Sequence, residues 1–218
     1  MPSYTEENYL KAIYNIGLAS GKSVSTNQIA QRLQTKASSA TDMIKRLSEK
    51  GLVDYQKYQG VSLTSKGKAI AVSTIRSHRL WEYFLVNHLD YNWDEVHELA
   101  EQLEHIKSNS LIEKLDTFLC FPTHDPHGDP IPDKDGRIIP HKNTMLSSLG
   151  EQESGMVVGV KDSSPELLQL LDHSGIKLGS LIKIIRQEAF DLSMCVDLGE
   201  GPLSISHQVS KNLYVTKS

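Results

Sequence analysis

The sequence predicts a mostly α-helical protein that ends in a small β domain. Between residues 5 and 119 apolar residues recur at helical spacing, with one short alternating stretch at residues 52–63. From residue 155 the pattern changes to short β-like runs separated by turn residues. A chain of 218 residues can hold two or three small domains. We expect an N-terminal winged helix-turn-helix at 1–68, a helical metal-binding and dimerisation domain at 69–141, and an SH3-like barrel at 142–218.

The composition limits the class of protein. A net charge of −4 and a hydrophobic share of 39% are typical of a folded chain rather than a disordered one. The two cysteines, Cys120 and Cys195, form no CxxC pair, which argues against a disulfide framework and against a thiolate zinc site. The polar N-terminus and the lack of an apolar run of ~20 residues predict neither a signal peptide nor a membrane helix. We therefore expect a cytoplasmic protein with no membrane partner.

The first segment has the element order of a winged helix-turn-helix. Thr5 and the pair Ser38–Ser39 are expected helix N-caps. Gly17 and Gly21 are expected to end the first helix, and Gly51 the third. The Gln59–Gly60 turn joins two alternating runs that are typical of the strands of a wing. The expected elements are helices at 5–16, 25–33 and 38–50, then strands at 52–57 and 61–63.

The charge of this segment favours DNA binding. Between Arg32 and Lys57 six basic residues stand against three acidic ones, although the whole chain is acidic. Short polar groups at the start of the third helix can approach base edges or phosphates, and the later basic residues suit backbone phosphates. The candidate DNA-binding residues are Lys36, Ser38, Ser39, Thr41, Asp42, Lys45, Arg46 and Lys57. Winged helices also bind proteins, and this segment alone leaves that alternative open.

A stretch of metal-ligand residues, VHELAEQLEH at 96–105, lies in the middle of the chain. On one helix, His97, Glu101, Glu104 and His105 would share a face. His78 and Glu82 repeat the mixture one turn apart on the preceding expected helix, at 66–89, which Thr64 or Ser65 would cap. If the two helices are antiparallel, the six side chains meet in one small volume. A solvated acidic helix face is the alternative interpretation.

The remaining segments complete the expected architecture. Trp93 is expected to open the ligand helix, and a further helix should run from Asn109 to Leu119. Three helices make a small core, so we expect a homodimer, which would suit a palindromic DNA site. The Pro/Gly/Asp-rich loop 122–140 contributes His124, Asp125 and His127 as ligands or as parts of an ordinary solvated turn. Five β-like runs and a helix at 165–175 favour an SH3-like barrel.

Several motifs together resemble the diphtheria toxin repressor family of metal-dependent transcriptional regulators, and especially its manganese-responsive branch. They are ENYLKAIY, LTSKGKA, SHRLWEYFLVNHL, VHELAEQLEH and FPTHDPHGDPIP, and the resemblance covers essentially the whole chain. It implies a homodimer that binds Mn(II) or Fe(II) and then binds palindromic operator DNA, mostly to repress metal-uptake genes.

The resemblance also implies two metal sites. The first would use Asn8, Glu101, Glu104 and His105, although this branch usually has Asp at the position of Asn8 and the iron-responsive branch has Cys at that of Glu101. The second would use His78, Glu82 and His97 in one variant of the family. In the variant with a longer loop, which the DPHG segment matches, it would use Glu82, Asp125, His127 and Asp162. His124 and Glu166 are further candidates.

Two other classes of function remain open at this point. Carboxylate–histidine clusters also bind catalytic metals, so a metallohydrolase is an alternative, although no nucleophile or oxyanion arrangement is evident. A winged-helix regulator whose metals are purely structural is the other.

Overall fold

The protein is described by a computed structural model that covers residues 2–21, 23–56, 59–138, 143–199 and 201–217. It forms two compact units. The first comprises Met1–His78, Glu101–Glu113 and Pro132–Arg137, and the second comprises Arg79–Ala100, Lys114–Ile131 and Ile138–Ser218.

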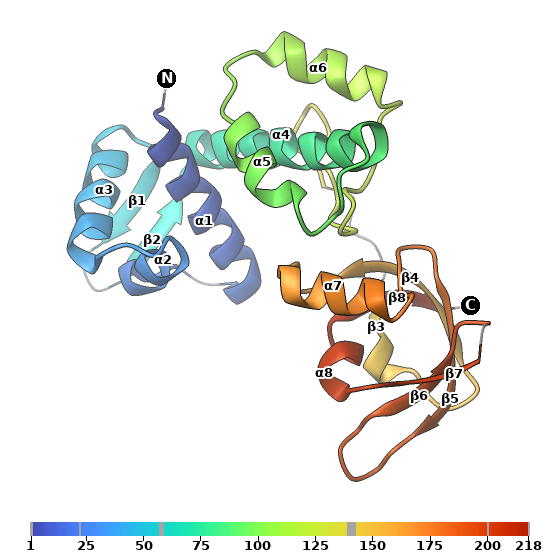
Figure 1. The fold of residues 1–218 in the computed structure, drawn as a ribbon. Helices are drawn as coiled ribbons and strands as arrows, with labels where there is room; N and C mark the ends of the chain where they lie inside the picture. Colours follow the sequence, from blue (N-terminus) through green and yellow to red (C-terminus); the bar gives the residue numbers. More distant parts are fainter. Residues whose placement is uncertain (1, 22, 57–58, 139–142, 200, 218) are drawn as a thin grey trace. The chain divides into compact units, whose positions relative to one another are not determined.

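The N-terminal part of the first unit is a winged helix-turn-helix, as predicted (Figure 1). Its elements are α1 (Tyr4–Ser20), α2 (Thr26–Arg32), α3 (Ala37–Glu49), β1 (Val53–Gln56) and β2 (Gly60–Leu63). The two strands pair antiparallel, with Val53 opposite Leu63. Leu10, Ile29 and Ile44, one from each helix, are fully buried in a shared core. Burial of one apolar stripe per helix therefore holds the three helices together.

The helix starts differ from the sequence expectation in two places. Ser3 rather than Thr5 caps α1, because the Ser3 hydroxyl accepts the Glu6 backbone N–H while the Glu6 carboxylate accepts the Ser3 N–H. Of the two glycines expected to end this helix, the chain continues through Gly17 and the helix ends at Gly21, whose φ of 62° is left-handed. The recognition helix α3 starts at Ala37 with no side-chain cap, so Ser38 and Ser39 lie inside its first turn.

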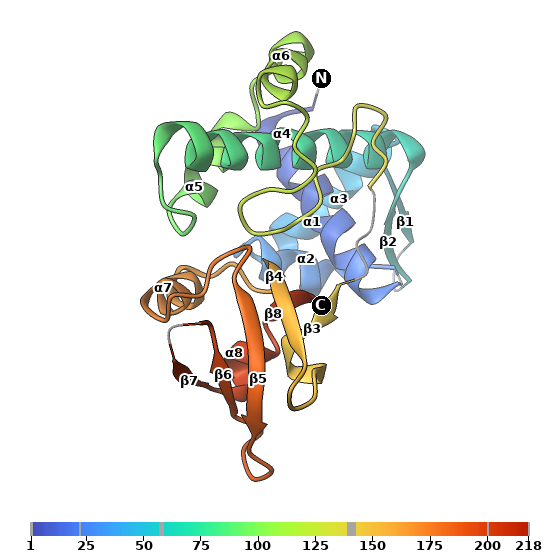
Figure 2. The same cartoon turned by 90° about the vertical axis from the view of Figure 1, so that its right-hand side faces the viewer.

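The middle of the chain forms α4 (Ser65–Leu89), α5 (Val96–Leu103) and α6 (Asn109–Phe118), which are labelled in Figure 2. The ligand helix is shorter than expected at both ends. Trp93 lies in a turn before α5, and Glu104 and His105 lie in the turn after it. The expectation that four ligand-type side chains share one face of this helix was therefore wrong. The helix ends at Leu103, so helical geometry does not set the directions of the Glu104 and His105 side chains.

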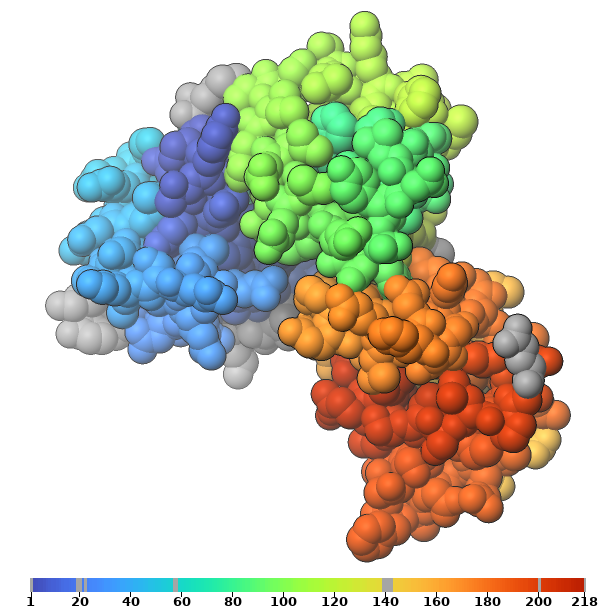
Figure 3. All heavy atoms as spheres, viewed as in Figure 1, coloured from blue at the N-terminus to red at the C-terminus, as the bar shows by residue number. Residues whose placement is uncertain are grey.

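The barrel lies in the second unit and is a six-stranded antiparallel sheet in the order β3-β8-β4-β5-β6-β7. Leu168 and Leu171 of helix α7 pack into the same core as Ile182 and Ile184 of the sheet. Figure 3 shows α7, in orange, against the red end of the barrel. The elements are β3 (Thr144–Met145), η1 (Leu146–Ser148), β4 (Ser154–Val160), α7 (Pro165–His173), β5 (Leu181–Gln187), β6 (Met194–Asp197), β7 (Pro202–Ile205), α8 (His207–Ser210) and β8 (Leu213–Lys217).

The small β domain is confirmed, and β3 adds a sixth strand to the five expected. Two residues are too short for an alternating pattern to reveal a strand. Among the described residues, no helix combines the length and apolarity needed to cross a membrane.

Candidate metal centre

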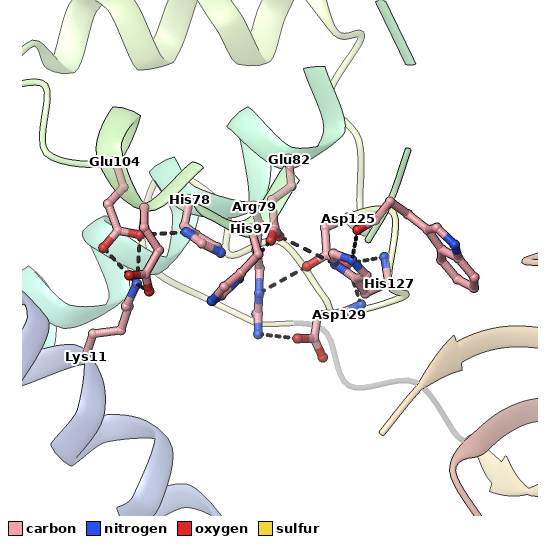
Figure 4. Close-up of polar contacts among 11 residues, drawn as sticks. Lys11, His78, Arg79, Glu82, His97, Glu104, Asp125, His127 and Asp129 are labelled. Carbon is pink, nitrogen blue, oxygen red and sulfur yellow. Dashed lines mark hydrogen bonds and ion pairs between the residues drawn. The ribbon is translucent and has the colours of Figure 1, made fainter. Parts of the chain in front are cut away.

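Three ligand-type side chains gather in the second unit: Glu82 from α4, and Asp125 and His127 from the loop that follows α6 (Figure 4). One ligand atom from each lies within 4.8 Å of the other two. The residues are 2%, 4% and 4% exposed, respectively. Buried carboxylates rarely gather without a compensating cation. The arrangement therefore fits a metal ion that prefers oxygen and nitrogen donors.

The shape of the loop follows from its sequence. The Asp125 carboxylate oxygen Oδ1 accepts the backbone N–H groups of His127 at 2.8 Å and Asp129 at 2.9 Å, which closes a tight turn. Gly128 supplies the left-handed φ of 84° that this turn needs. Oδ2, the other Asp125 oxygen, accepts neither of these bonds and faces Arg79 at 3.5 Å.

Arg79 ties this loop to α4. Its NH1 group donates to the Pro130 carbonyl at 2.6 Å, and its NH2 group donates to the Asp129 carboxylate at 3.1 Å. A guanidinium beside these carboxylates offsets part of their mutual repulsion. The sequence analysis did not identify Arg79. Its position three residues before Glu82 did not reveal this role, because a lone arginine on a long helix usually faces solvent.

Burial and neighbouring charges shift the pKa values of Asp125 and His127. Burial and the negative charges of Glu82 and Asp129 raise the pKa of Asp125 to about 7. At His127, burial opposes a charged ring, but the carboxylates of Glu82 and Asp125 outweigh it and raise the pKa to about 9. A cation that binds the His127 imidazole must therefore displace a proton from it.

Of the other predicted ligands of the second site, His97 also lies beside Glu82, whereas His78 and Asp162 have other partners. The His97 imidazole Nδ1 lies 3.3 Å from Glu82 Oε1, and its side chain is 53% exposed. His78, one helical turn before Glu82, has its Nδ1 atom 2.7 Å from Glu104 Oε2. Asp162 is exposed and its carboxylate accepts the Ser164 backbone N–H at 3.0 Å.

Two further candidates, His124 and Glu166, belong to no such group of ligand-type side chains among the described residues. The His124 Nδ1 atom lies 2.9 Å from the Thr123 hydroxyl, and Glu166 is exposed in the first turn of α7.

The other predicted site lies in the first unit, and Lys11 occupies its centre. The Lys11 ammonium donates to Glu101 Oε1 at 3.0 Å and to both carboxylate oxygens of Glu104 at 2.8 Å (Figure 4). His105 instead pairs through Nδ1 with Glu7 Oε2 at 2.7 Å. In this arrangement the chain's own cation, rather than an open space, lies between the two carboxylates.

Asn8 has a different environment from the other three predicted ligands of this site. Its side-chain oxygen is buried without a hydrogen-bond partner among the described residues. Asn8 lines a pocket that also includes Ser39, Asp42 and Arg46 of α3. An unpartnered buried oxygen suits a cation, but the amide brings no charge. The sequence analysis missed Glu7 and Lys11, which share one face of α1 at i and i+4 spacing and could have been found from that spacing.

The candidate DNA-binding residues lie where the fold places a recognition helix. Lys36, Ser38, Ser39, Asp42, Lys45 and Arg46 are exposed. Thr41 is half-buried, and its hydroxyl donates to the Ala37 carbonyl at 2.8 Å. Lys57 lies outside the described residues.

Comparison with known proteins identifies the family. Residues 1–61 match "Iron dependent repressor, N-terminal DNA binding domain", residues 64–133 match "Iron dependent repressor, metal binding and dimerisation domain", and residues 144–217 match "FeoA domain". The iron-dependent repressor IdeR of Mycobacterium leprae is 33% identical over 160 residues, which cover 72% of this chain and 69% of that protein. The chain belongs to the iron-dependent repressor family. The predicted resemblance is confirmed, and the family consists of DNA-binding regulators rather than enzymes.

Solved structures agree over nearly the full length. A "Manganese-dependent transcriptional repressor complex with manganese" is 35% identical with a TM-score of 0.85, over 98% of this chain and 100% of that one. The "manganese regulator SloR" is 33% identical with a TM-score of 0.74, over 98% of each chain. A "Probable metal transport system membrane protein" of Chlamydia trachomatis is 46% identical over 86 residues, but this chain spans only 19% of its length.

Proposed function

We propose that this protein is a transcriptional repressor that binds Mn(II) or Fe(II) and then binds the operators of metal-uptake and metal-homeostasis genes. The observation that carries the proposal is the buried group Glu82, Asp125 and His127 in a chain that begins with a winged helix. Manganese-dependent repressors of the same fold support it.

The ligand chemistry favours a hard divalent cation. The three buried side chains offer carboxylate oxygens and an imidazole nitrogen, and no sulfur. Oxygen-rich sites suit Mn(II) and Fe(II), whereas thiolates favour softer ions. Affinity measured in vitro will nonetheless follow the general order in which Zn(II) binds more tightly than Mn(II). Selectivity must therefore be judged from the DNA-binding response rather than from affinity.

A bound cation supplies positive charge to carboxylates that repel one another. Asp125 and His127 hold the loop and Glu82 holds α4, so ligation by all three favours one arrangement of loop and helix. A ligand that favours one arrangement shifts its population. A coupling of about 1–3 kcal/mol is enough to change operator affinity 5–150-fold.

Ion pairs within the first unit offer a route to the recognition helix. In the turn after α5, Glu104 pairs with Lys11 of α1, and His105 pairs with Glu7 of the same helix. On the same helix, Glu6 pairs at 2.6 Å with Lys50, which caps the C-terminus of α3. We infer that α1 would transmit a displacement of the turn after α5 to α3 through these pairs.

We further propose that the chain acts as a cytoplasmic homodimer on a palindromic operator, with residues 1–68 binding DNA and residues 69–141 binding metal and dimerising. The barrel at 142–218 would be the third domain. The family descriptions name DNA-binding, metal-binding and dimerisation domains in that order. Two recognition helices related by two-fold symmetry read two half-sites about 34–36 Å apart.

The test is fluorescence anisotropy of the full chain with DNA from upstream of its own gene, first in chelator and then with Mn(II) or Fe(II), at fixed salt. We expect binding to require metal. Glu82→Gln and His127→Ala should abolish the metal response and leave the far-ultraviolet circular dichroism unchanged. Glu98→Gln, an exposed carboxylate on α5, is the matched control and should respond like the wild type.

Equal DNA binding with and without metal would refute the proposal and favour a structural metal. Metal-stimulated hydrolysis of a phosphoester or a peptide would favour the hydrolase alternative.

A further inference from the structure

Trp93 connects the metal-ligand loop to the barrel. It precedes α5 and lies in the second unit, as do the loop and the barrel. Its backbone carbonyl accepts a hydrogen bond from His127 Nε2 at 2.8 Å. Its indole ring stacks on the His127 imidazole, with ring centroids 6.3 Å apart and planes 11° from parallel. One residue therefore contacts the ligand imidazole both in its plane and on its face.

These contacts decide which His127 nitrogen is available to a metal ion. A neutral imidazole carries one N–H, and the nitrogen that donates to a carbonyl leaves the other nitrogen as the lone-pair donor. Nε2 donates to the Trp93 carbonyl, so Nδ1 is the donor atom. Nδ1 also lies on the side of Glu82, 3.8 Å from its Oε2 atom. Partners of this kind orient metal-ligating histidines and raise their basicity.

Helix α7 of the barrel holds Trp93 in turn. The indole Nε1–H donates to Asp172 Oδ2 at 2.9 Å, and the Trp93 ring packs against the barrel core. The next residue, Asp94, accepts a hydrogen bond from Gln169 at 2.8 Å. Gln169 and Asp172 are three residues apart and share one face of α7. In Figure 3 the green segment before α5 lies directly against the orange α7.

The barrel also holds the loop from its other side. The Val160 N–H of β4 donates to the His127 carbonyl at 2.9 Å. Gly128 lies so close to β4 that a Cβ atom there would be 2.1 Å from the Val158 carbonyl oxygen. The ligand residue His127 is therefore fixed between β4 and the α7–Trp93 contact.

We propose that Trp93 is a positioning residue for the metal site, and that Asp172 of α7 sets the affinity of the site through it. The barrel then acts as part of the metal sensor, because a movement of α7 changes the orientation of His127. This inference rests on the proposed function and deepens it. Loss of a partner that orients a ligand typically lowers metal affinity 10–100-fold. Asp172 is exposed, so we expect the lower end, about tenfold.

The test is Mn(II) titration of the full chain by isothermal calorimetry, with four single variants and one double variant. Asp172→Ala and Trp93→Phe both remove the indole–carboxylate bond, and each should weaken Mn(II) about tenfold. Asp172→Asn keeps an acceptor oxygen and should bind like the wild type. Asp191→Ala removes a carboxylate from the β5–β6 turn and is the control. Because the two residues act through one bond, Trp93→Phe/Asp172→Ala should be no weaker than the weaker single variant.

A spectroscopic measurement separates positioning from general destabilisation. The chain has two tryptophans, so Trp81→Phe leaves Trp93 as the sole reporter. Its emission should change on Mn(II) binding in that background and change less when Asp172→Ala is added. Nitrogen-15 NMR with diamagnetic Zn(II) should show the N–H of His127 at Nε2.

The outcomes are distinguishable. If the wild type fails to bind Mn(II), the proposed function and this inference both fail. If the wild type binds but folded Asp172→Ala binds equally well, or Asp172→Asn is as weak as Asp172→Ala, the inference alone is overturned. A metal-bound His127 with its N–H at Nδ1 would also overturn it.

Discussion

Replacing Lys11 with methionine removes the ammonium group that Glu101 and Glu104 share. The Glu104 side chain is fully buried, and without Lys11 it still faces the imidazoles of His78 at 2.7 Å and His105 at 3.6 Å. Removing one partner of a buried ion pair destabilises a protein by about 3–5 kcal/mol. Because these two imidazoles remain beside the carboxylate, we expect the lower end of this range, about 3 kcal/mol. Glu101, whose side chain is 41% exposed, should add little.

The loss should be visible by thermal denaturation in chelator. For a chain of this size, 3 kcal/mol corresponds to a Tm decrease of roughly 6–12 °C. Without Lys11, the two carboxylates are available to a metal ion. Mn(II) at 100 times its Kd stabilises a binding state by about 2.7 kcal/mol. Added Mn(II) should therefore restore most of the lost Tm in Lys11→Met.

Calorimetry gives an independent measurement of the same effect. We expect one tightly bound Mn(II) per wild-type chain and two per Lys11→Met chain. Lys114→Met, which replaces an exposed lysine of α6, should match the wild type in both assays. A Tm in chelator within 1 °C of the wild type, or an unchanged Mn(II) stoichiometry, would refute the assignment of Lys11 as the resident cation.

Three further predictions concern the loop, the recognition helix and α1. Gly128→Ala should lower Mn(II) affinity more than tenfold, because the added Cβ atom would collide with β4. The control is Gly175→Ala, which has a similar φ of 70° but open space around it; it should lose only about 1–2 kcal/mol of stability and keep its Mn(II) affinity. Calorimetry measures both affinities. Lys45→Ala should weaken specific and non-specific DNA alike and reduce the slope of log K against log salt by about 1. Lys50 holds the pKa of Glu6 below its usual range, so this pair stabilises the fold above the ordinary glutamate pKa and ceases to do so as the pH falls through the lowered value. Glu6→Gln should therefore lower Tm at pH 7 but not at pH 2; an equal Tm difference at both would contradict this.

The sequence was sufficient to predict the order of helices and strands, because that order follows from patterns among residues close together in the chain. Apolar spacing placed the helices, and alternation with Gln59–Gly60 placed the wing. The element ends were harder to predict. Thr5 and Ser38 are good caps by residue type, but Ser3 with Glu6 makes a reciprocal pair, and Lys36 already has the extended backbone that starts α3. Competing caps a few residues apart differ by too little free energy for composition to rank them.

For the metal ligands, too, the sequence predicted some features and not others. Residue type marked Glu82, Asp125 and His127 as ligand candidates, because carboxylates and imidazole have metal-binding chemistry. Only the family resemblance grouped these three into one predicted site, together with Asp162. The sequence could not show that Lys11, 90 residues before Glu101, pairs with it. Nor could it show that Trp93 lies between His127 and Asp172.

The sequence by itself determined the fold class, the family and the chemical character of the metal ligands. The tertiary structure alone decided which side chains meet. It placed Lys11 between Glu101 and Glu104, Arg79 beside Asp125, and the barrel helix α7 behind Trp93. The reason is physical. Helix and turn propensities depend on neighbours in the sequence, whereas the stability of a buried charge depends on the partners that packing brings within a few ångströms of it.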